Sequence, residues 1–213
     1  MGISETLIQL VKMEHALEIM GKNTLSIADA VKAFRISLSQ PQLTALSHVP
    51  YSEKTLTECK DTHILFAVFP LSINNIREMV IREEVGQIFS PKFWYKHEPF
   101  ALNFGETVWQ LIRKTPVPNT FLKTLEEHQS IFLSQDEEIP KARKMVYAIV
   151  GWYIAKEERL FENVHVRCSD KDAFGVRLSV SGLGPRGLDI TNEYGNRRNK
   201  NLCLVPIRKF DRR

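Results

Sequence analysis

A glycine-rich stretch, Gly182-Leu-Gly-Pro-Arg-Gly187, has the G-x-G-x-x-G letters of a dinucleotide-binding loop. Such a loop needs a strand before it, a helix after it and an acidic residue about 20 positions further on. Here Pro185 interrupts the stretch, and residues 188–191 alternate like a strand. Too little chain follows for a βαβ unit, so the pattern favours a glycine-rich hairpin turn.

A second stretch, Asp170-Lys-Asp-Ala-Phe-Gly175, begins like a calcium-binding loop. An EF-hand needs a further side-chain ligand and a Glu at loop position 12, and Ser181 occupies that position. The pattern therefore favours a turn, while a looser site built from Asp170, Asp172 and Asp189 stays an alternative. We expect no bound metal and no cofactor.

The histidines and cysteines could supply a nucleophile and a base, but their spacing does not pair them. His165 and Cys168 are three apart on an expected strand, so their side chains lie on opposite faces. An odd number of cysteines argues against a disulfide framework, and we predict that Cys168 and Cys203 are core residues. The other histidines that could converge on a cysteine are His63, His97 and His128. An enzyme whose residues meet only in the folded protein therefore remains an alternative.

The segment between the last two expected strands, residues 191–201, is rich in Asn, Arg and Lys. Polar loops on a rigid sheet commonly carry recognition. The candidate ligand-binding residues are Asn192, Tyr194, Asn196, Arg197, Arg198, Asn199 and Lys200. Our leading hypothesis is non-enzymatic binding of a protein or a small ligand through this loop, and a solvated hairpin is the alternative without function.

The distribution of charge suggests a second function for the same segment. The chain carries a net charge of +4, and residues 186–213 contain eight Lys and Arg against three Asp and Glu. The basic character is therefore confined to the tail. Arg197, Arg198 and Lys200 could grip phosphates, which predicts salt-dependent binding of nucleic acid as the first rival function.

The expected elements give an α+β protein. Residues 140–161 have apolar side chains three and four positions apart, which predicts a long amphipathic helix. Period-two alternation follows at 164–170 and 176–181, then at 188–191 and 202–207, which predicts a small antiparallel sheet under that helix. We expect residues 86–213 to form this C-terminal α+β domain.

Residues 1–85 are expected to be mainly helical, with a boundary near residue 85 that could also lie within one domain. Helices are predicted over residues 5–20, after a capping box at Ser26 and Asp29, over 41–46, and after Ser72. A continuous apolar run at 63–69 predicts a buried strand. In the second part, residues 108–112 predict another strand and 121–133 a helix.

The start of the chain gives an expectation about location. Residues 1–20 include Glu5, Lys12, Glu14, His15 and Glu18, so they lack the uninterrupted apolar core of a signal peptide. No apolar run approaches the ~18 residues of a membrane span. We therefore expect a cytoplasmic protein without a membrane partner.

Three segments, Pro50–Leu56, Trp109–Asn119 and Glu158–Asp170, resemble a family of bacterial proteins from small-genome candidate phyla. The resemblance spans most of the chain from about Pro50, and it implies no known activity. Members typically end in a variable segment, a strand and Arg-Lys-Phe, as residues 208–210 do here. This chain departs from the pattern by having Tyr194 where a Trp is common, and basic residues where acids are common.

The C-terminal part also distantly resembles the C-type-lectin-like fold of formylglycine-generating enzymes and of variable proteins from diversity-generating retroelements. The paired catalytic cysteines of the enzyme have no counterpart here, so the resemblance implies a binding role and no catalytic residues.

Overall fold

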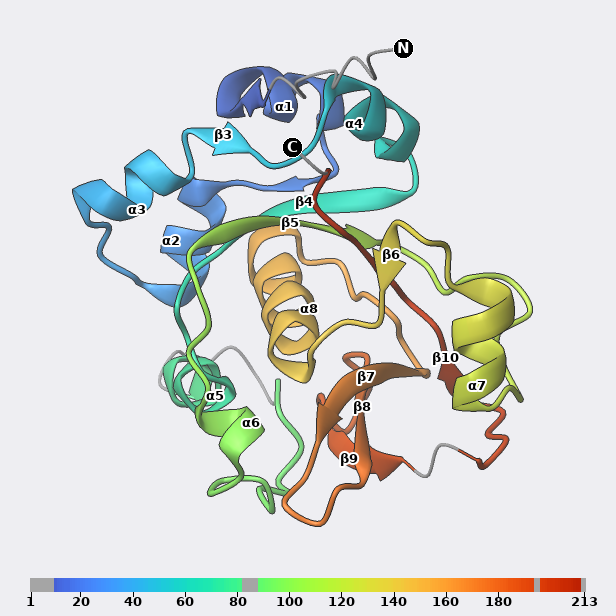
Figure 1. Ribbon diagram of the computed structural model, residues 1–213. Helices are drawn as coiled ribbons and strands as arrows, with labels where there is room; N and C mark the ends of the chain where they lie inside the picture. The colour runs from blue at the N-terminus through green and yellow to red at the C-terminus, as the bar shows by residue number, and fades with distance from the viewer. Residues whose placement is uncertain (1–9, 82–87, 194–195, 212–213) are drawn as a thin grey trace.

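The computed structural model describes residues 10–81, 88–193 and 196–211, and within them it has an α+β architecture with three sheets (Figure 1). Helix α8 (Ala142–Lys156) lies at the centre of the molecule. A five-stranded sheet arches over one side of this helix, and a four-stranded sheet lies on the other. The expected α+β class is confirmed.

The five-stranded sheet has the order β2-β4-β5-β11-β6. Its strands are β2 (Thr24–Leu25), β4 (His63–Val68), β5 (Val108–Arg113), β11 (Ile207–Arg208) and β6 (Glu137–Glu138). All six residues of β4 are buried, which confirms the strand predicted from its continuous apolar run. β4 pairs with β5 antiparallel and with β2 parallel.

Short helices lie on both sides of this sheet. They are α1 (Met13–Met20), α2 (Ile27–Phe34), α3 (Gln40–Ala45), α4 (Glu53–Cys59), α5 (Ile73–Ile81) and α6 (Pro99–Leu102). α1 packs with α4 on the outer side of the sheet, whereas α2, α5 and α6 contact α8. The capping box predicted for α2 is present, since the Asp29 amide donates to Ser26 Oγ at 3.1 Å and the Ser26 amide to Asp29 Oδ2 at 2.9 Å. β1 (Val11–Lys12), which pairs with β3 (His48–Val49) in a two-stranded sheet, immediately precedes α1, so the described part of the first helix begins at Met13.

The predicted helix over 121–133 was too long. Asn119 and Leu122 have left-handed backbone angles, with φ of 62° and 58°, and a new capping box begins at Thr124. The helical part is therefore α7 (Leu125–Glu127), which continues as the π-helix η1 (His128–Phe132).

Helix α8 is buried nearly all round, although the sequence predicted an amphipathic helix. Apart from the half-buried Lys144, the residues from Ala142 to Trp152 are buried, because the two sheets and α2 cover different sides of the helix. Its Gly151 allows the close approach of α2, since a Cβ there would lie 2.8 Å from Leu25 Cδ2 and 3.1 Å from Phe34 Cε2. The helix ends at Lys156, five residues before the predicted end at 161, because Glu157 adopts a left-handed backbone with a φ of 58°.

The four-stranded sheet has the order β10-β7-β8-β9. The predicted hairpin is confirmed as β7 (His165–Lys171) and β8 (Arg177–Ser181), followed by β9 (Ile190–Glu193). Its turn is held by Asp172, whose Oδ1 accepts the amides of Phe174 and Val176 at 2.9 and 2.8 Å.

The last predicted strand, 202–207, divides between the two sheets. β10 (Leu202–Cys203) pairs with β7, and the pairing is parallel, so this sheet is mixed rather than antiparallel throughout. β11 joins the five-stranded sheet instead. Pro206 stands between them and has no amide hydrogen for a ladder, so it separates the two strands.

The predicted boundary near residue 85 lies in residues 82–87, outside the described part of the chain. Strands on both sides of it, β4 and β5, pair within one sheet, and a single hydrophobic core includes residues from Val11 to Ile207. None of the helices in the described ranges is long and apolar enough to cross a bilayer.

Buried His63 predicts how stability depends on pH. Burial and the nearby Arg113 and Arg208 lower the pKa of His63 from 6.5 to about 4. The unfolded chain therefore takes up this proton at a higher pH than the folded protein does. The stabilising contribution of the neutral His63 to the free energy of unfolding is fully present above pH 6.5 and is lost as the pH falls towards 4. This loss is on the order of 3 kcal/mol.

We expect the free energy of unfolding, measured with urea between pH 7 and 4, to fall with pH in the original protein and to fall less steeply in the variant His63→Leu. The exposed His97→Leu is the control and should retain the original slope. An identical slope in His63→Leu and the original protein would contradict the assignment.

Candidate functional site

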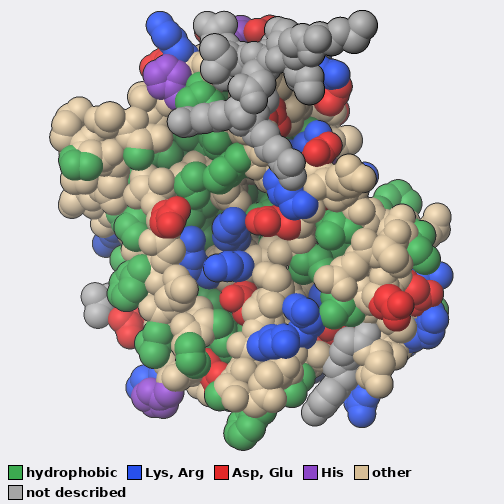
Figure 2. All heavy atoms as spheres, viewed as in Figure 1, with side chains coloured by type: hydrophobic (Ala, Val, Ile, Leu, Met, Phe, Trp, Pro, Cys, Tyr) green, Lys and Arg blue, Asp and Glu red, His purple; other side chains and the backbone are tan. Residues whose placement is uncertain are grey.

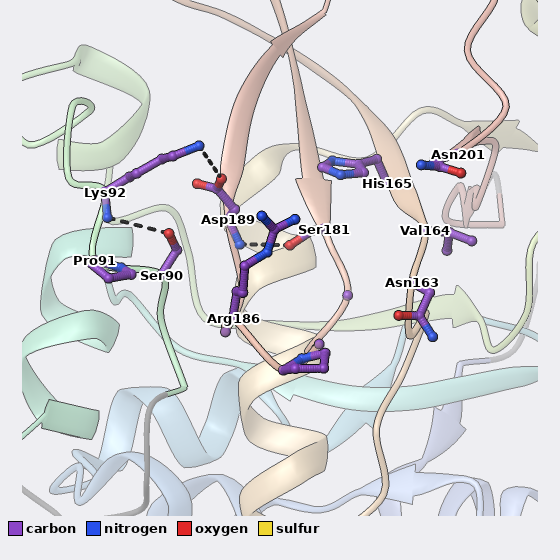
Figure 3. Close-up of a pocket in the computed structure, with 14 residues that line it drawn as sticks. Ser90, Pro91, Lys92, Asn163, Val164, His165, Ser181, Arg186, Asp189 and Asn201 are labelled. Carbon is purple, nitrogen blue, oxygen red and sulfur yellow. Dashed lines mark hydrogen bonds and ion pairs between the residues drawn. The ribbon is translucent and has the colours of Figure 1, made fainter.

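A pocket of about 720 Å³ opens at the end of the four-stranded sheet (Figure 3). Its walls come from four regions of the sequence: the segment before α6, the start of β7, the glycine-rich turn after β8, and Asn201 before β10. The residues that line it are Ser90, Pro91, Lys92, Asn163, Val164, His165, Ser181, Gly182, Gly184, Pro185, Arg186, Gly187, Asp189 and Asn201. Polar and apolar surface contribute about equally to the lining.

The glycine-rich turn predicted over 182–187 is confirmed, with the Gly187 amide donating to the Gly184 carbonyl at 2.9 Å. Two of its glycines are required by close backbone contacts. A Cβ at Gly182 would lie 1.8 Å from the Phe161 carbonyl oxygen, and one at Gly187, whose φ is 77°, would lie 2.6 Å from the Phe89 carbonyl carbon. At Gly184 the same test finds nothing within 4 Å, so this glycine leaves open space beside the pocket.

A short backbone pairing attaches the Lys92 wall to this turn. The Ser90 amide donates to the Leu188 carbonyl at 2.8 Å, and the Leu188 amide donates to the Ile88 carbonyl at 2.7 Å. The turn thereby holds residues 88–92 against the sheet, which places Lys92 at the pocket although it lies far from β8 in the sequence.

A row of three polar residues crosses the sheet at the pocket. His165 and Ser181 are register partners on β7 and β8, and the Ser181 amide donates to the Asp189 carbonyl at 2.8 Å. Because opposed residues point to the same face, all three side chains lie on one side. The Ser181 hydroxyl accepts the Asp189 amide at 2.7 Å, and Asp189 Oδ2 lies 3.5 Å from Lys92 Nζ.

Four polar side chains of the pocket have no partner among the described residues. Arg186, Asn163, His165 and Asn201 make no side-chain hydrogen bond or ion pair with any residue in those ranges. Burial lowers the pKa of His165, with a partial opposing effect from Asp189, so its imidazole is neutral at pH 7. Each of these groups can therefore bond to a ligand without first breaking a contact inside the protein.

The row of Ser, His and Asp does not form a catalytic triad. A triad needs the imidazole between the hydroxyl and the carboxylate. Here the strand order places Ser181 between His165 and Asp189, and the Ser181 hydroxyl accepts a backbone amide. The arrangement suits hydrogen bonding to a ligand better than activation of the serine.

The cysteines lie in the core, as predicted for Cys168 and Cys203. Cys168 is buried on the face of β7 opposite His165. Burial raises the pKa of Cys59 to about 11 and of Cys203 to about 12, and it also raises that of Cys168. The thiols are therefore protonated at neutral pH and poor nucleophiles.

The three aspartates of the looser calcium alternative have separate structural roles. Asp170 accepts the Ala142 amide at the start of α8, Asp172 holds the hairpin turn, and Asp189 faces Lys92. Within residues 10–81, 88–193 and 196–211, no group of three or more His, Cys, Asp or Glu could hold a metal ion.

Several residues of the predicted recognition loop hold the protein's own structure together. Asn192 donates to Asp172 Oδ2 at 2.5 Å, and Arg198 pairs with Glu127 at 2.9 Å. Asn199 Oδ1 accepts the Asn201 amide at 2.9 Å. Asn196, Arg197 and Lys200 are exposed, and Tyr194 lies outside the described residues.

Most of the pocket was not expected from the sequence. The predicted binding residues did not include Lys92, Asn163, Arg186 or Asn201, and His165 was considered only as a partner of Cys168. The one signal that could have found the site is the glycine-rich turn with Arg186 inside it, since two of its glycines permit the contacts that bring the walls together.

The turn gives a matched test of this construction. We expect Gly182→Ala to lower the free energy of unfolding by about 2 kcal/mol or more, because its Cβ would overlap the Phe161 carbonyl. Gly184→Ala should change it by less than about 0.5 kcal/mol, since the added methyl meets open space. Urea unfolding measures both, and equal losses would contradict the described geometry of the turn.

The fold and the pocket were also compared with known proteins. No protein-family model, no curated protein and no solved structure matches the chain. The function therefore has to be inferred from the chemistry of the pocket's own side chains.

Proposed function

We propose that the protein binds a small, hydrophilic, negatively charged ligand in this pocket and does so without catalysis. The observation that carries the proposal is the set of polar side chains around one cavity that lack partners in the described structure: Arg186, Asn163, His165 and Asn201. His165 is half-buried, and Asn163, Arg186 and Asn201 are exposed at the pocket. All four side chains are therefore accessible to a ligand, and a concave site with several converging polar groups is typical of small-molecule binding.

The charges of the pocket favour an anion. Lys92 and Arg186 stand against one carboxylate, Asp189, and the neutral His165 adds no charge, so the described lining has one cation in excess. Arg186 offers a planar fork that matches carboxylate and phosphate oxygens, and Lys92 adds a compact ammonium. The volume of about 720 Å³ lies in the range of small-molecule sites.

The recognition loop predicted from the sequence enters this proposal through its last residue. Asn201 lines the pocket, and its carbonyl accepts the His165 amide at 2.7 Å, which ties the end of the loop to β7. Recognition of a protein by the exposed residues Asn196, Arg197 and Lys200 remains part of the hypothesis. The bonds of Arg198 and Asn199 support the view that residues 196–201 form a border of the site.

Two further expectations from the sequence belong to this proposal. A central helix on a mixed sheet, followed by a polar loop and a final short strand, supports the C-type-lectin-like resemblance at the level of a binding role. The resemblance to the candidate-phylum family adds no activity. The expected location remains the cytoplasm.

Removal of either cation should weaken anion binding. We expect Lys92→Ala and Arg186→Ala each to raise the Kd for inorganic phosphate roughly tenfold, because each loses a charge-assisted contact. Isothermal titration calorimetry at low salt measures this effect. The exposed loop variant Lys200→Ala is the matched control and should retain the original Kd.

A variant that fills the pocket tests the location independently. Gly184→Trp places a ring where no atom lies within 4 Å of the added Cβ, so the fold should be retained while the cavity is filled. We expect phosphate binding to disappear with the unfolding temperature little changed. Retained phosphate binding in Gly184→Trp, or equal weakening in Lys200→Ala, would contradict the proposed site.

Nucleic-acid binding by the basic tail is the rival function. Arg198 already pairs with Glu127, which leaves fewer cations for phosphate contacts. We expect the triple variant Arg197→Ala, Arg198→Ala, Lys200→Ala to leave inorganic phosphate binding unchanged. A steeply salt-dependent binding of duplex DNA that the triple variant abolishes would favour the rival instead.

A further inference from the structure

We infer that the ligand is a phosphate monoester of a small polyhydroxylated molecule. This inference rests on the proposed function and specifies the ligand class of the same pocket. The phosphate lies at the end with Lys92 and Arg186, and the hydroxyl groups lie at the end with the two asparagines and His165.

The pocket has two chemically different ends (Figure 3). Lys92, Asp189 and Arg186 gather on one side of the view, and His165, Asn163 and Asn201 on the other, with Ser181 between them. The contacts agree with this division. Lys92 pairs with Asp189 at 3.5 Å, whereas the His165 amide donates to the Asn201 carbonyl at 2.7 Å.

The charged end suits a phosphate better than a carboxylate. Its two cations come from different walls, Lys92 from the segment before α6 and Arg186 from the glycine-rich turn. A planar carboxylate is satisfied by the guanidinium alone, whereas the three terminal oxygens of a phosphate monoester can reach both cations. A monoester carries a charge of about −1.5 to −2 at pH 7, which also offsets the repulsion from Asp189 better than a single charge does.

The neutral end suits hydroxyl groups. The amides of Asn163 and Asn201 each offer donors and an acceptor, and the neutral imidazole of His165 offers one of each. A hydroxyl group also donates and accepts, so a chain of hydroxyls can satisfy all three side chains. A second charged group would meet no opposite charge at this end.

The composition of the lining argues against a nucleotide. Among the described residues that line the pocket, none is Phe, Tyr or Trp, and the apolar side chains are Pro91, Val164 and Pro185. A base would therefore find no aromatic platform on which to stack. The hydrophilic part of the ligand is better matched by a polyol.

The test compares sorbitol 6-phosphate, inorganic phosphate and sorbitol by isothermal titration calorimetry on the full chain. We expect the ester to bind at least about tenfold more tightly than inorganic phosphate, and sorbitol alone to show no measurable binding. Asn163→Gly and Asn201→Ala should each weaken binding of the ester by roughly fivefold and leave the affinity for inorganic phosphate unchanged. Glycine is chosen at 163 because that residue has a φ of 63°.

Asn119→Gly is the matched control, since Asn119 has a φ of 62° and lies outside the pocket. This variant should change neither the affinity for the ester nor the affinity for inorganic phosphate. If inorganic phosphate binds and the ester binds no more tightly, the ligand class is wrong while the anion site stands. If gluconate or adenosine monophosphate binds as tightly as the ester, the class is also wrong. If no anion binds, the proposed function fails together with the inference.

Discussion

The burial of α8 between two sheets is the constraint on which the rest of the structure depends. A helix covered on nearly all sides must present mainly small or apolar residues, and between Ala142 and Trp152 all residues except the half-buried Lys144 are buried. Arg143 fits this environment because its guanidinium donates to the Phe69 and Leu71 carbonyls at 3.2 and 3.4 Å. The position of the helix thereby sets the distance between the two sheets and fixes the sheet that carries the pocket.

The four-stranded sheet has two faces of different character, and its function follows from that difference. One face presents Val166, Cys168 and Val180 to the core. The other is polar, and part of it is fully covered: Arg167 has no exposed surface and lies 3.2 Å from Glu193, which is also buried. Burial raises the pKa of Glu193, while the charge of Arg167 opposes that effect. At the pocket end of the same face the polar groups are left open to solvent instead of being covered.

The glycine-rich turn and the polar loop show why a functional segment is hard to locate from composition. The loop has many polar residues, but Asn192, Arg198 and Asn199 bond within the protein. The turn has one charged residue, yet its tight backbone contacts join residues 88–92 to the sheet and create the cavity. The availability of a side chain for a ligand depends on what it contacts in the folded chain, which composition does not report.

By itself the sequence determined the elements that depend on local patterns: the capping box of α2, the buried strand β4, the β7–β8 hairpin, and the turn at Gly182–Gly187. These follow from periodicity, caps and turn chemistry, which act over a few residues. Only the tertiary structure decided that α8 is buried on nearly every side, that the residues after Asn201 divide between two sheets, and that Lys92 meets Arg186 and His165 at one cavity. Those outcomes depend on contacts between segments distant in the sequence, for which a single sequence contains no local signal.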